Sequence, residues 1–361
     1  MTHPTELNNW VYDVHAYPKN AKVNVEKEVD DAQTPAVGSP ISYTITADVP
    51  DAPVVDYYNV VDQYDKRVNL PENQIMLQMV EAKDGDVPLV KGEDYTLTPA
   101  VGTDGKTNFW TAEFTEAGRK KMIAQRKSND TKIVMSLEGT LKEKIGDEGL
   151  VENKAILLPG APANNWTPGS GEVPPPDYPN AKVVSKFGKV TITKTSSVDD
   201  TKKLQGAEFQ VYKCKPTTKP ANNFESVDAS LDTKLTVDGK DTFVTDDQGK
   251  VTIDGLRNND WEDNEAVADP GYYCLVETKA PDGFELQSRP IAFQILESNS
   301  TKDNKYTLET TVKDVPKNGG FNLPLTGAAG VGVLIGTGAL LVAGSGAIVL
   351  ANKRRKEQAD A

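Results

Sequence analysis

Short stretches in which apolar and polar residues alternate recur along most of the chain. The clearest of them are Val23–Lys27, Ile41–Thr46 and Val190–Lys194. Alternation with a period of two indicates β-strands that bury one face. A helical pattern is plausible only locally, at Glu116–Arg126. We therefore expect an all-β fold in which helix is a minor element.

A change of composition divides this pattern into two modules. Residues 159–180 are rich in Pro, Gly, Ser and Asn, which is typical of an interdomain linker, fairly stiff where prolines cluster. The flanking segments, 21–158 and 181–316, are each long enough to bury the core of a β-sandwich. The sequence thus predicts two tandem immunoglobulin-like β-sandwiches.

Strand parity places polar side chains on apolar faces in both modules. In the second module these residues are Lys194, Glu277 and Asp314, and in the first they are Lys27, Asp62 and Asn153. Burying such groups is costly unless they pair or react, and desolvation lowers the pKa of an amine while raising that of a carboxyl group. A neutral lysine could then attack a carbonyl polarised by a protonated carboxyl group. From the residues alone, ordinary buried ion pairs or solvated strand ends are the simpler interpretation.

The C-terminal segment has the composition of a membrane anchor. Residues 328–352 are almost entirely apolar or small and are followed by the basic run Lys353–Lys356. Such a segment is long enough to cross a bilayer as a transmembrane helix, and its basic end should stay in the cytoplasm. Everything that precedes it is then expected to lie outside the cell. An ordinary C-terminal anchor would fit the apolar run and the basic tail equally well.

The five residues just before this segment indicate whether it is an ordinary membrane anchor or a segment that is cut off after export. They are Leu323, Pro324, Leu325, Thr326 and Gly327. With the apolar run and basic tail, which make up residues 317–361, they resemble the LPXTG sorting signal of Gram-positive wall-anchored proteins. The resemblance implies that a sortase thiolate attacks the carbonyl of Thr326 and releases the chain from Gly327 onward, after which an amine captures the thioester.

The two modules resemble domains of surface adhesins and pilins. Residues 187–316 resemble the collagen-adhesin B-type domain, and the run Tyr272–Phe284 resembles the E-box of pilins. Residues 21–158 resemble, more loosely, the A-type domain of shaft pilins. The resemblance implies two intramolecular isopeptide bonds, Lys194–Asp314 with Glu277 as proton shuttle and Lys27–Asn153 with Asp62 in that role. The family more often has Asn at the position of Asp314.

The cysteines are Cys214 and Cys274. In an exported protein a small even number of cysteines suggests one disulfide, and unpaired thiols are the alternative. Both residues lie on the parity opposite to the apolar faces of their strands. The collagen-adhesin family often places a disulfide there, which implies a Cys214–Cys274 bond.

Residues 1–20 contain a motif that resembles the pilin motif of shaft subunits. Its matching residues are Trp10, Val14, Tyr17, Pro18 and Lys19, with Ala16 in place of the usual Val. The resemblance implies that the Lys19 amine captures the Thr326 acyl group of the next subunit. The sequence begins without a secretion signal although its C-terminus requires export, so we expect a signal and an N-terminal domain to precede it.

Composition narrows the remaining function classes. The net charge is −13 and the pI is about 4.8, which argues against a nucleic-acid partner. With only His3 and His15 as imidazoles, a zinc site or a Ser-His triad has little support. We therefore expect no metal, no cofactor and no enzymatic activity beyond the self-reaction of the two polar trios.

These features predict the backbone subunit of a sortase-assembled pilus, anchored in the cell wall after a transient membrane stage. The expected partners are pilus-specific and housekeeping sortases, neighbouring pilin subunits and peptidoglycan, and a host-surface receptor stays open. The alternative is a monomeric wall-anchored adhesin in which Lys19 is idle. A minor basal or tip pilin is a third hypothesis, but such a subunit usually lacks a working pilin motif or adds a binding domain.

Overall fold

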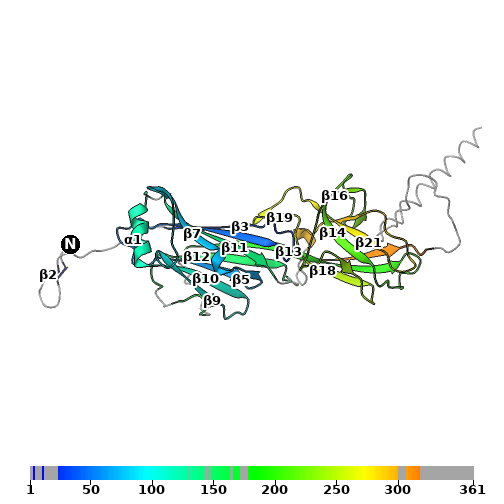
Figure 1. The fold of residues 1–361 in the computed structure, drawn as a ribbon, viewed down its shortest axis with the longest axis horizontal. Helices are drawn as coiled ribbons and strands as arrows, with labels where there is room; N and C mark the ends of the chain where they lie inside the picture. Colours follow the sequence, from blue (N-terminus) through cyan, green and yellow to red (C-terminus); the bar gives the residue numbers. More distant parts are fainter. Residues whose placement is uncertain are drawn as a thin grey trace, which may run out of the picture.

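The computed structural model describes residues 23–317, except for residues 129, 143–144, 146–147, 163–165, 171–177 and 300–305. It also describes β1 (His3–Pro4) and β2 (Trp10–Val11), which pair antiparallel. The predicted transmembrane segment, residues 328–352, lies outside the described residues. Within them, no helix is both long and apolar enough to cross a membrane. The fold is almost entirely β, as predicted, and its two halves follow one another along the long axis (Figure 1).

The first half is a sandwich of two sheets, here called sheets A and B. The strands of sheet A, in spatial order, are β3 (Val25–Asp30), β4 (Pro40–Asp48), β11 (Lys132–Leu141), β7 (Ile75–Ala82) and β8 (Gly85–Pro88), with β6 (Val68–Asn69) paired to β11. Those of sheet B are β18 (Lys250–Arg257), β13 (Asn180–Ser196), β12 (Leu150–Leu158), β5 (Asn59–Asp65), β10 (Thr107–Phe114) and β9 (Tyr95–Val101), with β23 (Thr307–Asp314) paired to β13.

The second half packs the β18–β13–β23 end of sheet B against a third sheet, sheet C. Its strands, in spatial order, are β15 (Glu225–Ser226), β22 (Ile291–Phe293), β21 (Tyr272–Lys279), β14 (Glu208–Pro216) and β16 (Ala229–Lys234), with β17 (Phe243–Val244) paired to β14. A separate small hairpin joins β19 (Trp261–Glu262) to β20 (Glu265–Ala266).

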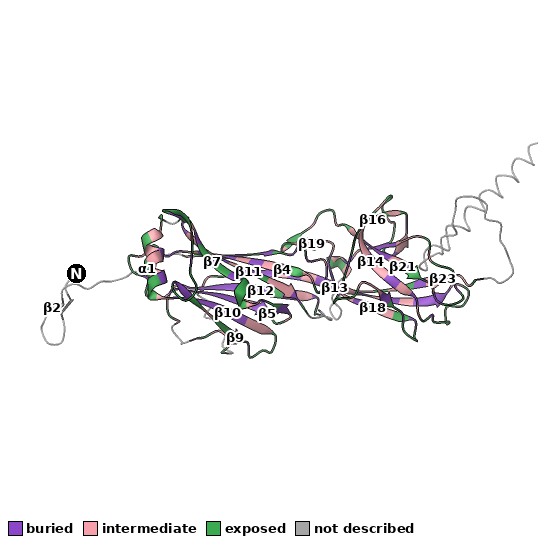
Figure 2. Cartoon of the chain, viewed as in Figure 1, coloured by how far each residue is buried: buried purple, intermediate pink, exposed green. Residues whose placement is uncertain are grey.

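Alternation along the strands builds two main hydrophobic cores, one in each half. β4 shows the rule, because Ile41, Tyr43, Ile45 and Ala47 are buried while the residues between them are part-exposed. One core fills the space between sheets A and B, and the other lies between the β13 end of sheet B and sheet C. Buried and part-exposed residues follow one another along the strands of both halves (Figure 2).

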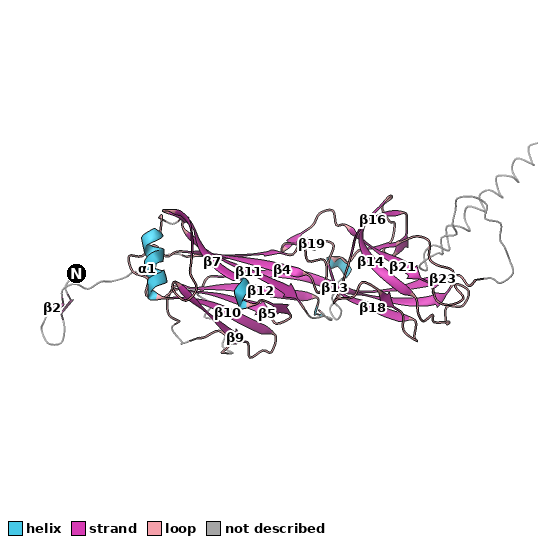
Figure 3. Ribbon diagram, in the orientation of Figure 1, coloured by secondary structure: helices cyan, strands magenta, loops and turns pink. Residues whose placement is uncertain are grey.

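Helices are short, and α1 (Glu116–Gln125) is the longest in the described part of the chain (Figure 3). The Thr115 hydroxyl caps it by accepting a hydrogen bond from the Gly118 amide at 3.0 Å. The predicted local helix is therefore confirmed, ending one residue before Arg126. The 3-10 turns η1 (Glu72–Gln74) and η3 (Glu297–Asn299) are shorter still.

The strand β13 belongs to both halves. Its residues 180–186 pair with β12, and residues 187–193 pair with β18. At about 3.3 Å per residue, a strand of 17 residues reaches about 55 Å. The segment before it also contacts the first half, because Trp166 is buried against Val61 and Phe109 on the outer face of sheet B. The Pro- and Gly-rich segment is thus partly packed against the first sandwich.

A loop of the first half completes the joint beside β13. The Val37 amide donates to the Gly255 carbonyl at 2.8 Å, and the Arg257 amide donates to the Pro35 carbonyl at 2.9 Å. Gly255 has a φ of 101°, and a Cβ added there would lie 2.3 Å from Val37 Cγ2. Only glycine permits both this conformation and this close approach.

Candidate cross-link sites

The three polar residues predicted for the second module meet inside its core. Lys194 lies on β13, Asp314 lies on the parallel neighbour β23, and Glu277 reaches them from β21 in the opposite sheet. The Lys194 amine donates a hydrogen bond to Asp314 Oδ1 and lies 2.7 Å from Glu277 Oε1. All three side chains are at most 1% exposed. One amine and two carboxyl groups are thus held together away from water.

The surroundings of this trio favour a neutral carboxyl group. Burial raises the pKa of Asp314 to about 6, with Glu277 adding to the rise and Lys194 opposing it. The backbone N–H of Gln287 fixes Glu277 by donating a hydrogen bond to its Oε2 at 2.8 Å. The ring of Phe209 lies 5.4 Å from the Lys194 amine and excludes water from that side. Phe209 could have been anticipated, because it lies on the apolar face of β14, but not its contact with this amine.

The first module brings its trio together across the two sheets. Lys27 on β3 donates to Asp62 Oδ1 on β5 at 2.6 Å, and both side chains are 0% exposed. Asn153 on β12 is also buried, two register positions from Asp62, since Ala155 is the residue that faces Asp62 across the ladder. Neither Asn153 Oδ1 nor Nδ2 has a hydrogen-bond partner among the described residues. The Asn153 side chain nevertheless lies close enough to Asp62 to limit the rise in the pKa of that carboxyl group.

Burial governs the ionisation of Lys27 and Asp62. It lowers the pKa of the Lys27 amine, although the Asp62 charge opposes the effect. It raises the pKa of Asp62, which Lys27 and the neighbouring Asn153 amide partly counteract. The Tyr43 ring, 5.2 Å from the Lys27 amine, covers this amine as Phe209 covers Lys194. Both shifts favour the neutral forms of the two groups.

The cysteines form a disulfide, as predicted. Cys214 on β14 and Cys274 on β21 are bonded, with their Cα atoms 5.7 Å apart. They lie on the outer face of sheet C, where Val227 and Ala292 pack around them. The bond closes a loop spanning 60 positions, for which the chain-entropy model gives about 4 kcal/mol of stabilisation.

A buried polar contact at the joint was not anticipated. Arg257 Nη1 lies 3.2 Å from Asp31 Oδ1, and the Asp263 amide donates to the same oxygen at 2.8 Å. Burial raises the pKa of Asp31, while Ser185, Asp263 and Arg257 limit the rise. The partners are more than two hundred positions apart, so no local pattern could have revealed the contact.

The remaining predicted sites lie outside the residues whose side chains the structure describes. They are the pilin motif with Trp10, Val14, Tyr17, Pro18 and Lys19, and the sorting signal Leu323–Gly327. Among the described residues, no group of His, Cys, Asp and Glu side chains is arranged to hold a metal ion.

Comparison with known proteins identifies relatives that agree with one another. Residues 188–311 match the family model of the SpaA prealbumin-like fold domain. The fimbrial subunit type 1 of Actinomyces viscosus is 41% identical over 375 residues, which cover 98% of this chain and 68% of that protein. The fimbrial subunit type 2 of Actinomyces naeslundii is 32% identical over 370 residues, covering 97% of this chain and 64% of that one. The chain thus spans about two thirds of the length of these relatives.

Solved structures agree with this assignment. The fimbrial protein FimP of Actinomyces oris aligns with a TM-score of 0.69 at 35% identity, over 88% of this chain and 73% of that one. Domains D2 and D3 of the major pilin SpaD of Corynebacterium diphtheriae align with a TM-score of 0.61 at 28% identity, over 81% of this chain and 99% of that one. These relatives are structural proteins of extracellular surface fimbriae rather than enzymes. The chain belongs to the fimbrial subunits of Gram-positive bacteria, the family of the major, or shaft, pilins.

Proposed function

We propose that this pilus subunit is joined covalently to its neighbours and is locked internally by two isopeptide bonds. The observation that carries the proposal is the water-excluded trio of Lys194, Glu277 and Asp314. Burying one amine with two carboxyl groups costs free energy that an ordinary ion pair seldom recovers. A condensation reaction removes the buried charges and accounts for the arrangement.

In the second module the proposed reaction is a dehydration. The neutral Lys194 amine attacks Cγ of the protonated Asp314 carboxyl group, and Glu277, 2.7 Å from the amine, polarises the carbonyl and transfers the protons. The new bond joins Nζ to Cγ, the Cγ–hydroxyl bond breaks, and one water leaves. Burial favours the protonated Asp314 that this step needs, since the pKa of that group is raised to about 6.

In the first module the corresponding reaction is a transamidation, in which a bond from Lys27 Nζ to Asn153 Cγ forms and the Asn153 Cγ–Nδ2 bond breaks. The Lys27 amine attacks Cγ of Asn153, Asp62 transfers the protons, and ammonia leaves. The lowered pKa of Lys27 and the raised pKa of Asp62 both favour the reactive neutral forms. Asp62 is close enough to the Asn153 side chain for the two groups to interact, so a protonated Asp62 can polarise the carbonyl that Lys27 attacks.

Between subunits, we propose that a pilus-specific sortase forms a thioester at Thr326 and that Lys19 of a neighbouring copy captures it. A housekeeping sortase then transfers the last subunit to peptidoglycan, after a stage at the membrane through residues 328–352. The support for these steps is the sequence of the sorting signal and of the pilin motif, together with membership of the fimbrial subunit family.

An immunoblot of wall extracts boiled in reducing SDS tests this linkage. We expect a ladder of high-mass species for the native subunit and collapse to monomer for Lys19→Ala, because no other amine is expected to replace that nucleophile. Lys219→Ala, a change at an exposed loop lysine, is the matched control and should keep the ladder. A single anchored band for the native subunit would instead establish the monomeric adhesin.

A further inference from the structure

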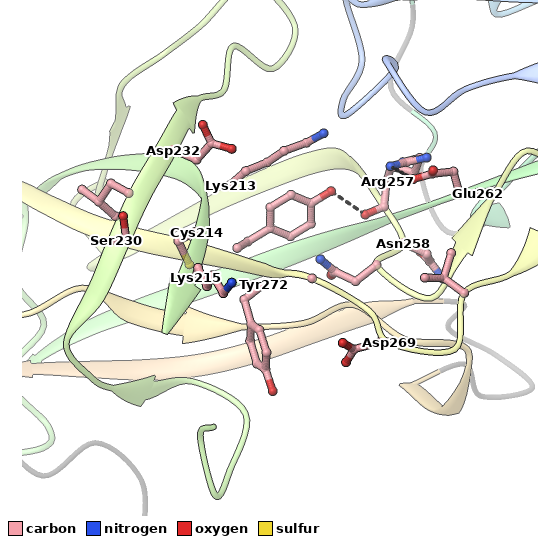
Figure 4. A pocket seen from close by; sticks show the side chains of 15 residues that line it. Lys213, Cys214, Lys215, Ser230, Asp232, Arg257, Asn258, Glu262, Asp269 and Tyr272 are labelled. Atoms are coloured by element: carbon pink, nitrogen blue, oxygen red, sulfur yellow. Dashed lines mark hydrogen bonds and ion pairs between the residues drawn. The ribbon is translucent and has the colours of Figure 1, made fainter. Parts of the chain in front are cut away.

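A pocket on the second module is separate from both cross-link sites and from the motifs of assembly. It has a volume of about 550 Å³ and lies between the β14–β16 face of sheet C and the segment that follows Arg257 (Figure 4). Small-molecule sites commonly have volumes of roughly 300–1,000 Å³. The pocket therefore has room for one small ligand.

An orphaned amide lines this pocket. Asn258 is 1% exposed, and neither its Nδ2 nor its Oδ1 has a hydrogen-bond partner in the described part of the chain. The backbone of Asn258 is fixed, because its backbone N–H donates a hydrogen bond to the Lys186 carbonyl at 2.9 Å. Buried polar atoms are nearly always hydrogen-bonded, and leaving one unsatisfied costs about 1–3 kcal/mol. A ligand that both accepts and donates a hydrogen bond would satisfy this side chain.

A cation that has no ion-pair partner in the described ranges lines the same pocket. Lys213 is half-buried on β14 and has no ion-pair partner among the described residues, whereas Arg257 is already engaged by Asp31 and Glu262. Lys213 faces Tyr273 across the ladder, and the Tyr273 hydroxyl donates to the Arg257 carbonyl at 2.8 Å (Figure 4). Burial lowers the pKa of Lys213, and the Arg257 charge adds to the effect. Glu262 and Asp232 partly oppose this lowering, and an anion bound in the pocket would oppose it further.

The rest of the lining limits the kind of anion. Asp232 and Asp269 also line the pocket, so a dianion such as phosphate is disfavoured and a single carboxylate is preferred. These carboxylates, together with Asn258 Oδ1, are acceptors that need donors from the ligand, and hydroxyl groups supply them. Leu231, 41% exposed, and the part-exposed Tyr272 face Cys214 across the ladder and therefore lie at the outer edge of the pocket rather than beside Lys213.

We propose that this pocket binds the carboxylate and adjacent hydroxyl groups of an acidic sugar. Lys213 and Asn258 Nδ2 donate to the carboxylate, and Asn258 Oδ1 accepts from a neighbouring hydroxyl group. The site is independent of polymerisation, because none of these groups belongs to the cross-link trios, the pilin motif or the sorting signal. An acidic peptide side chain offers the carboxylate without the adjacent hydroxyl groups, which is why the sugar is favoured.

A ligand-observed NMR titration of the full chain tests the proposal, with glucuronate as the probe. We expect saturable binding of glucuronate and none of glucose or inorganic phosphate. Lys213→Gln should weaken binding at least tenfold, as expected for the loss of one charge-assisted hydrogen bond. Lys234→Gln, which removes the same charge from an exposed pair with Asp241, should leave the Kd unchanged.

A second variant distinguishes a loss of ligand binding from a loss of folding. Asn258→Leu removes the orphaned amide and should abolish binding while leaving the melting temperature equal or higher. The proposal is overturned if glucuronate does not bind, if it binds Lys213→Gln as tightly as the native chain, or if N-acetylglutamate binds and glucuronate does not. The last result would assign the pocket to an acidic peptide.

Discussion

Replacing Glu277 with glutamine tests the proposed chemistry of the second module at its proton shuttle. The substitution keeps the shape of a side chain that lies 2.7 Å from the Lys194 amine but removes its ability to exchange protons. We expect Lys194 and Asp314 to remain unjoined. They are 120 positions apart, and for a loop of this length the chain-entropy model attributes about 5 kcal/mol to the cross-link. For a module of this size that loss lowers Tm by roughly 20 °C.

The assay combines intact-protein mass spectrometry with calorimetry. After reduction of the disulfide, the native chain should be lighter than its sequence mass by one water and one ammonia, and Glu277→Gln should regain the water alone. Asp314→Asn should still react but release ammonia instead of water. Glu208→Gln is the control, because this carboxylate pairs with Lys279 at the surface and takes no part in the reaction.

Two results would refute this reasoning. A native chain with its full sequence mass would show that the trio is an ordinary buried ion cluster. A Glu277→Gln variant that still loses the water would show that the carboxyl group is not needed as a shuttle. In either case, the burial of the three groups would need another explanation.

Three further predictions concern the disulfide and the joint. Replacing Cys214 and Cys274 together by serine should lower the free energy of unfolding by about 4 kcal/mol in denaturant titrations, with no change in the mass loss caused by the isopeptide bonds. Because the folded pKa of Asp31 lies above its unfolded value near 3.8, the folded state binds the extra proton. The native chain should therefore gain stability relative to Asp31→Asn as pH falls through the folded pKa toward 3.8, and a difference that shrinks in this window would contradict the assignment. Gly255→Ala should cost about 3 kcal/mol through the clash and the positive φ, whereas Gly239→Ala, also at positive φ but facing open space, should cost only about 1 kcal/mol when both are measured by calorimetry.

Local sequence patterns were enough to predict much of the fold and the polar site of the second module. Alternation of apolar and polar residues is a property of single strands, so it predicted the β class and the inward direction of Lys194, Glu277 and Asp314. The same parity placed the cysteine pair on the outer face of sheet C. These features depend only on which face of a strand a residue occupies.

Contacts between distant segments were not predictable in this way. The composition around Trp166 indicates a linker, yet its indole ring is buried because it packs against an apolar patch on sheet B. The pairing of Asp31 with Arg257 depends on how the two halves meet, which no periodicity encodes. For the same reason, the double membership of β13 could not be deduced from its alternation alone.

The shared strand β13 has a consequence for how a fimbria flexes. Two domains joined by a free linker can swivel, but here a bend between the halves would have to break ladder hydrogen bonds to β12 or β18, each worth about 1 kcal/mol. The β19–β20 hairpin and the loop at Val37 brace the same point from the side. Each subunit should therefore behave as a stiff segment, and the curvature of the filament should be concentrated between subunits rather than within them.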